Sequence, residues 1–187
     1  MKGKWMPRFQ RTYLMLLVLL SCVGCDQLSK TIAKSSLEKS PPISYLGETI
    51  RLQYAENSGA FLSLGSGFSK RTRTVLFTVL SGVLLVALVG YILYNQDIGR
   101  GHTFALSLIL GGGVSNLLDR VFNDGKVIDF LNMGIGNLRT GIFNLADVVI
   151  MTGMALVVLL NLRLRRRRAA VEDFSDAGSE TEFEDEA

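Results

Sequence analysis

The sequence has few side chains that bind metals or form disulfide frameworks. Its 187 residues include one histidine, His102, and two cysteines, Cys22 and Cys25. A zinc site with the spacing His-x-x-x-His needs two histidines, and two cysteines form at most one disulfide bond. The Cys-x-x-Cys spacing lacks the further cysteine or histidine partners of a metal or redox site, so we interpret both cysteines as small apolar residues of a helix. We therefore predict no metal site.

Charged side chains are also scarce, and the acidic ones are segregated. Charged residues make up 20% of the chain, hydrophobic residues make up 48%, and the mean hydropathy is +0.30. Eight of the seventeen acidic residues lie within residues 172–187, and without these eight negative charges the formal net charge rises from +3 to +11. A water-soluble domain intersperses both signs of charge over its surface. This composition instead indicates a membrane protein with basic flanks and an acidic tail.

Four uncharged runs have about the length needed to cross a membrane. A spanning helix needs about 20 mostly apolar residues. The runs at residues 74–96 and 101–118 reach this length, whereas the other two reach it only if each takes in a carboxylate, Asp26 or Asp147. A carboxylate inside a span is costly and normally marks a functional site. We predict an α-helical integral membrane protein with four transmembrane helices, at about residues 12–29, 74–96, 101–118 and 143–162.

The flanks of these spans predict the domain organisation and the orientation. A basic segment at residues 1–11 precedes a membrane domain of residues 12–164, and residues 165–187 form a basic and then acidic tail whose composition predicts disorder. Basic residues concentrate beside the cytoplasmic ends of spans, so we expect both termini in the cytoplasm. Three basic residues before the second span argue against this orientation, namely Lys70, Arg71 and Arg73.

With this orientation, two segments lie on the outer face of the membrane. The first contains an alternating run at residues 50–54, and the second contains a short strand-like run at residues 127–131. We expect these runs to form a small β-sheet that lies on the outer face of the four-helix domain.

Four carboxylates fall near this outer face and are candidate catalytic groups: Asp26, Asp119, Asp129 and Asp147. Two carboxylates held close together cannot both ionise easily, so one takes a proton from water while the protonated one donates to a carbonyl oxygen. The alternative role, a helix cap or an ion-pair partner, is favoured for Asp119, which is beside Arg120. The same alternative is favoured for Asp26, four residues before Lys30. Sequence spacing leaves both Asp119 and Asp129 open as the partner of Asp147.

Five short motifs follow one another along the chain. They read DQLSK at residues 26–30, NSGAF at 57–61, GGGVSNLLDR at 111–120, VIDF at 127–130 and FNLAD at 143–147. In this order they resemble the motifs of lipoprotein signal peptidase (signal peptidase II), an aspartyl protease family of the bacterial membrane. The chain departs from the common family pattern at Phe61, Leu62 and Ser115.

The resemblance implies an activity and a role for each motif. It implies removal of the signal peptide from a diacylglyceryl-modified prolipoprotein by cleavage just before the lipidated cysteine, in a cradle formed by the outer sheet. It implies that the catalytic pair is Asp129 and Asp147. It implies that four residues line the site, hold substrate or orient the acids, namely Asn57, Asn116, Arg120 and Asn144. Three further polar residues match supporting positions, namely Asp26, Lys30 and Asp119.

The same resemblance implies a bacterial cytoplasmic membrane location and two kinds of partner, lipid-modified prolipoproteins and membrane lipid. It implies no cofactor, no nucleic acid and no obligate protein partner. Two other functions stay open from the residues alone. The chain could be a membrane lipoprotein modified at Cys22, because the preceding sequence is typical of a lipoprotein signal. It could also be a small ion-coupled transporter, although we find no internal repeat.

Overall fold

Long helices and a small sheet make up the fold. The computed structural model describes residues 6–59, 67–95 and 97–184, and it describes side chains as far as Arg167. The helical elements are α1 (Arg8–Leu37), α2 (Lys70–Arg73), the π-helical segment η2 (Thr74–Leu80), α3 (Ser81–Tyr94), α4 (Arg100–Phe122) and α5 (Leu145–Glu184). The strands are β1 (Ile43–Tyr45), β2 (Ile50–Asn57), β3 (Val127–Ile135) and β4 (Leu138–Arg139).

Among the described residues, four helical stretches are long and apolar enough to cross a membrane, and the second of them combines α2, η2 and α3. They are Arg8–Leu37, Lys70–Tyr94, Arg100–Phe122 and Leu145–Arg167. The predicted integral membrane fold with four transmembrane helices is therefore confirmed. The first helix runs well beyond the predicted end at residue 29, because Asp26 and Lys30 form an ion pair inside the protein instead of ending the span.

Apolar side chains cover the outside of these helices, and polar ones lie inside. Leu84, Val86 and Val158 are all more than half exposed, whereas Asp26 and Lys30 are buried. This distribution reverses the one found in water-soluble domains, and it suits a surface that contacts lipid. The polar interior is concentrated where the helices meet the sheet.

Three consecutive glycines let α4 pack closely against all three neighbouring spans. A Cβ atom built on Gly111 would lie 2.7 Å from Cβ of Cys22 on α1, and one on Gly112 would lie 2.5 Å from the backbone oxygen of Ala146 on α5. A Cβ atom on Gly113 would lie 2.6 Å from Leu85 on α3. The glycines therefore let α4 lie at the centre of the bundle, in close contact with its three neighbours.

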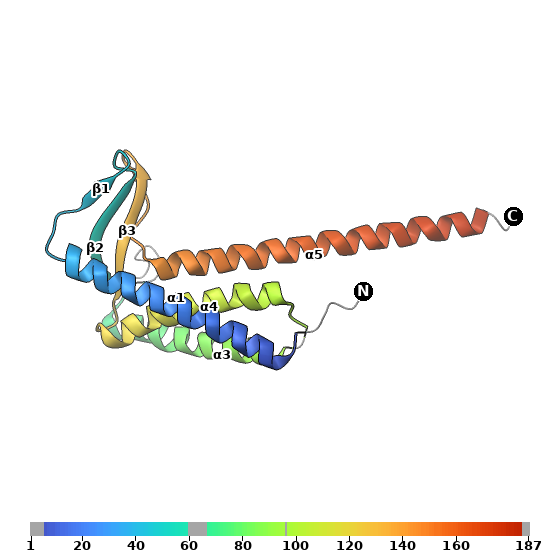
Figure 1. Ribbon diagram of the computed structural model, residues 1–187, viewed down its shortest axis with the longest axis horizontal. Coiled ribbons are helices and arrows are strands. Elements are labelled where there is room, and N and C mark those ends of the chain that lie inside the picture. The colour runs from blue at the N-terminus through green and yellow to red at the C-terminus, as the bar shows by residue number, and fades with distance from the viewer. Residues whose placement is uncertain (1–5, 60–66, 96, 185–187) are drawn as a thin grey trace.

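The four strands form one antiparallel sheet in the order β1-β2-β3-β4. In the central pair, Ala55 of β2 lies opposite Asp129 of β3, and Asn57 lies opposite Val127. A bridge between Leu131 and Phe143 then leads the chain from β3 to the start of α5. The predicted sheet is confirmed with two more strands than the sequence indicated, and Figure 1 shows it across one end of the helix bundle.

The last helix differs from the sequence-based expectation for the tail. Residues 165–187 were expected to be disordered, whereas the backbone of α5 continues as a helix to Glu184 and extends far beyond the bundle (Figure 1). Arginine, alanine and glutamate are good helix formers, and no proline interrupts residues 165–184. Local propensity therefore allows the helix to continue where composition alone suggested disorder.

Candidate active site

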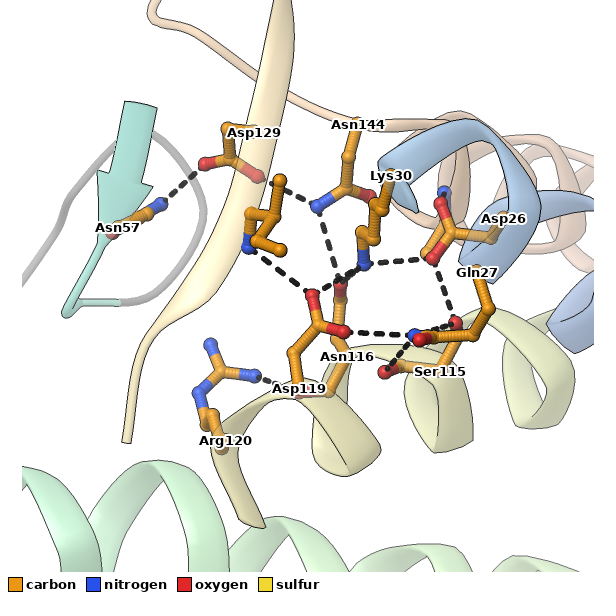
Figure 2. Close-up of polar contacts among 12 residues, drawn as sticks. Asp26, Gln27, Lys30, Asn57, Ser115, Asn116, Asp119, Arg120, Asp129 and Asn144 are labelled. Atoms are coloured by element: carbon orange, nitrogen blue, oxygen red, sulfur yellow. Dashed lines mark hydrogen bonds and ion pairs between the residues drawn. The ribbon is translucent and has the colours of Figure 1, made fainter. Parts of the chain in front are cut away.

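The carboxylate of Asp129 lies on β3 where the sheet meets the helices, and it is only 1% exposed. Two amides hold it (Figure 2). Nδ2 of Asn57 donates to Oδ2 at 2.9 Å, and Nδ2 of Asn144 donates to Oδ1 at 2.6 Å. Burial raises the pKa of Asp129 to about 6, and the nearby carboxylate of Asp147 also raises it, against the lowering effect of the two amides. Asp129 therefore keeps its proton to a higher pH than an ordinary aspartate.

The second acid, Asp147, lies in the first turn of α5 and is held by the end of its own helix. The backbone N–H of Asn144 donates to Oδ2 of Asp147 at 3.2 Å, and the backbone N–H of Asp147 donates to Oδ1 of Asn144 at 3.0 Å. This reciprocal pair is a capping box. Nδ2 of Asn116 donates to the other oxygen, Oδ1 of Asp147, at 3.0 Å. Since Asn144 bonds both Asp129 and Asp147, it ties the two acids to one place.

A buried cation lies behind this pair. Nζ of Lys30 is 2.7 Å from Oδ2 of Asp26 and 2.9 Å from Oδ2 of Asp119, and all three side chains are almost completely buried. The same Nζ donates to Oδ1 of Asn116 at 3.0 Å, as Figure 2 shows. Nδ2 of Asn144 donates to the same oxygen at 3.2 Å, so two donors orient the side chain of Asn116 and its amide nitrogen donates to Asp147.

The structure separates Asp119 from the two acids that Asn144 joins. Asp119 was expected to act as a cap or ion-pair partner, and it does so with Lys30 and not with the adjacent Arg120. Neighbouring residues on a helix point in different directions, so the side chains of Asp119 and Arg120 diverge. Oδ2 of Asp119 also accepts from the backbone N–H of Ile128 at 3.1 Å, which fixes the start of β3 against α4.

Asp26 was likewise expected to be a cap or an ion-pair partner, and it is both. Its Oδ1 accepts from the backbone N–H of Ala146 at 2.7 Å, in the first turn of α5. Its Oδ2 accepts from the hydroxyl of Ser115 at 2.7 Å and pairs with Lys30. The departure from the family pattern at Ser115 therefore adds a hydrogen bond to the buried carboxylate.

Arg120 connects α4 to the loop that follows β2. Its Nη1 donates to the backbone oxygen of Asn116 at 3.1 Å, and its Nη2 donates to the backbone oxygen of Gly59 at 3.0 Å. The guanidinium group thus holds the chain next to Asn57, which itself bonds Asp129. The departures at Phe61 and Leu62 lie outside the described residues.

One contributor to the site was missed by reasoning from the sequence. Nε2 of Gln27 donates to Oδ1 of Asp119 at 2.8 Å and to the hydroxyl of Ser115 at 2.9 Å. The available signal was its spacing, because Gln27 is three residues before Lys30 and faces the same side of α1. In the part of the chain with described side chains, no group of three or more histidine, cysteine or acidic residues could hold a metal ion.

Comparison with known proteins identifies the family. A family model described as "Signal peptidase (SPase) II" matches residues 18–163, which is most of the chain. The chain belongs to the signal peptidase II family. It is similar to the lipoprotein signal peptidase of Treponema denticola, with 33% identity over 81% of this chain and 90% of the relative. It is similar to that of Leifsonia xyli subsp. xyli, with 36% identity over 89% of this chain and 79% of the relative.

Solved structures support the fold assignment. A bacterial membrane enzyme determined by the in meso method at 2.3 Å resolution superposes with a TM-score of 0.72 at 24% identity, over 87% of this chain and 93% of that one. As a member of the signal peptidase II family, the chain is a protease, and the family is of the aspartic type. This membership favours the protease over the two alternatives, a lipoprotein modified at Cys22 and an ion-coupled transporter.

Proposed function

We propose that this chain removes signal peptides from diacylglyceryl-modified prolipoproteins, with Asp129 and Asp147 as the catalytic dyad. The observation that carries this proposal is the pair of hydrogen bonds by which Asn144 joins two carboxylates from distant parts of the chain. Aspartic proteases use two such carboxylates to activate water. No metal or other cofactor is needed for this chemistry.

The two acids are suited to different duties. Asp147 lies in the first turn of α5, where the positive end of the helix dipole favours a negative charge. The pKa of Asp129 is raised to about 6, so Asp129 is suited to hold the shared proton. We therefore assign the general base to Asp147 and the general acid to Asp129.

The reaction then follows from these assignments. Asp147 takes a proton from water while the water oxygen adds to the scissile carbonyl carbon and Asp129 protonates the carbonyl oxygen. The tetrahedral intermediate returns its hydroxyl proton to Asp129 as the carbonyl forms again. The carbon–nitrogen bond breaks, and the proton on Asp147 passes to the leaving amine of the lipidated cysteine. Asn57, Asn116 and Asn144 hold both acids in place throughout.

A cavity beside Asp147 supports a substrate that carries lipid. Its volume is about 400 Å³, and it lies between η2, α3, α4 and α5. Asp147, Asn116 and Arg120 line its polar end, and its other walls are mainly apolar, with Leu84 and Ile150 among them. Acyl chains can enter such a groove from the membrane while the peptide lies against the sheet. The diacylglyceryl group would then bring the bond before its cysteine to the acids.

A cleavage assay tests the substrate class. We expect purified enzyme to cut a precursor peptide whose cysteine carries diacylglyceryl and to leave the same peptide with a free cysteine uncut, because only the lipid occupies the groove. Mass spectrometry of the products should find the lipidated cysteine as the new N-terminus. Equal cleavage of both peptides, or cleavage at another bond, would contradict the proposed substrate.

The orientation is a further part of the proposal. We place both termini in the cytoplasm and the site near the outer face of a bacterial cytoplasmic membrane, since basic residues concentrate at the end of the bundle opposite the sheet. Among them are Arg8, Arg11, Arg100 and Arg163. A reporter fused after Ala187 should be active only when it is one that works in the cytoplasm. Activity from a reporter that works only outside the cytoplasm would reverse the orientation.

A further inference from the structure

A second large cavity lies at the end of the bundle opposite the acids. Its volume is about 640 Å³, within the range of about 300–1,000 Å³ that is usual for small-molecule sites. The end of α3, the first turns of α4 and the α5 segment around Asn161 line it. Figure 1 shows that α5 continues alone beyond this level, so the cavity lies where the last span leaves the bundle.

One wall of this cavity is apolar and continues toward the membrane interior. Leu106 of α4 faces it together with Val157 and Leu160 of α5. The two helices approach closely here, because a Cβ atom on Gly101 would lie 3.2 Å from the side chain of Leu160. Nε2 of His102 lies 3.1 Å from Oδ1 of Asn161, which joins the two helices beside the cavity. The wall is therefore formed by the close packing of α4 against α5.

The rim of the cavity is cationic. Arg163 and Arg167 line it, and their spacing of four residues places them on one face of α5. Within the described part of the chain, neither guanidinium group has a hydrogen bond or an ion pair. Asp97 is the one acidic residue among the lining residues. The rim therefore carries two positive charges against one negative charge.

Three other arginines at this end, two on α1 and one at the start of α4, are held by the protein. Arg8 lies over the ring of Tyr94, at 4.9 Å from its centroid. Arg11 is buried and donates to the backbone oxygen of Asn95, and Nη2 of Arg100 donates to the side chain of Gln10 at 3.2 Å. These three arginines have structural partners, whereas Arg163 and Arg167 have none among the described residues and are the arginines that line this cavity.

We propose that this cavity binds an anionic phospholipid, with its phosphate on Arg163 and Arg167 and an acyl chain along Leu106, Val157 and Leu160. Guanidinium groups bind phosphate oxygens through paired, charge-assisted hydrogen bonds. Basic pockets between spanning helices at the membrane surface suit such headgroups. A soluble phosphate would use only the rim, whereas a phospholipid uses both the rim and the apolar wall. The bound lipid would fill the gap at the point where α5 separates from α4.

Lipid titrations of the full-length protein in detergent, followed by native mass spectrometry, test this site. We expect phosphatidylglycerol to bind about tenfold more tightly than phosphatidylcholine, because each arginine near the surface adds a severalfold preference for an anionic headgroup. The double variant R163Q/R167Q should lose this preference. The double variant R165Q/R166Q removes the same charge from residues that do not line the cavity, and it should keep the preference to within about twofold.

The control variant separates a specific site from general attraction to basic residues. Equal loss of preference in both double variants would show general attraction only and would overturn the proposal, as would no loss in either. Displacement of the lipid by inorganic phosphate at millimolar concentration would assign the rim to a soluble anion and also overturn it. Cleavage of the lipidated precursor checks that both variants are folded, since these arginines lie at the end opposite the acids.

Discussion

Asp129→Asn and Asp147→Asn are each expected to reduce cleavage of a lipidated precursor to the background rate. Asparagine has nearly the shape of aspartate but cannot exchange a proton, so each change removes the chemistry and keeps the packing. In the proposed mechanism the two acids act on one water and one carbonyl group, so the double variant should be little slower than either single variant. A loss of about 10⁴-fold or more is the expected scale for groups that act as a catalytic unit. Single-turnover assays in detergent measure it.

Two acid-to-amide variants serve as controls for the dyad. Asp119→Asn tests the acid that sequence spacing could not exclude, and we expect measurable cleavage because Asp119 bonds Lys30 and Ile128, not the reacting groups. Asp124→Asn changes an exposed acid and should be fully active. If Asp129→Asn keeps most of its activity while a correctly inserted Asp119→Asn is inactive, the partner of Asp147 is Asp119 and the assigned dyad is wrong.

Lys30→Met is expected to cause the largest loss of stability of any single change at the site. Methionine leaves the carboxylates of Asp26 and Asp119 buried without their cation, and removing one partner of a buried ion pair typically costs about 3–5 kcal/mol. It also removes one of the two donors to Oδ1 of Asn116, whose amide donates to Asp147, and leaves only the longer bond from Nδ2 of Asn144 at 3.2 Å. The unfolding temperature in detergent and the cleavage rate should therefore both fall.

The matched control is a lysine-to-methionine substitution in an exposed ion pair. Nζ of Lys70 is 2.8 Å from Oδ1 of Asp124, and both side chains are about 70% exposed. Water screens such a pair, so Lys70→Met should leave the unfolding temperature and the cleavage rate nearly unchanged. Equal unfolding temperatures for Lys30→Met and Lys70→Met would show that the buried ion pairs do not hold the site together.

The two candidates for the partner of Asp147 show where sequence reasoning stops. Both Asp119 and Asp129 lie near the predicted outer face, and sequence spacing does not separate them. In the structure, Lys30 of α1 pairs with Asp119, while the register of β2 against β3 brings Asn57 and Asp129 together. These contacts join residues more than 70 positions apart, so they depend on how the helices and the sheet pack.

The resemblance to signal peptidase II already implied the pair Asp129 and Asp147. It gave no physical reason for preferring Asp129 to Asp119. The reason lies in the environments of the two acids. Asp119 forms an ion pair with Lys30, whereas Asp129 is bonded to amides and has its pKa raised to about 6. A carboxylate that keeps a proton can donate it, which suits Asp129 to the proposed role of general acid.

The four spans and the two central strands, β2 and β3, were predictable from the sequence alone. Length, hydropathy and alternation are local properties, and the need to satisfy every backbone hydrogen bond in lipid converts a long apolar run into a helix. Which polar groups meet depends instead on how the helices and the sheet pack. Burial makes an unpaired charge costly, so the partner that packing supplies sets the role of each carboxylate: Lys30 makes Asp26 and Asp119 structural, and Asn144 holds Asp129 beside Asp147.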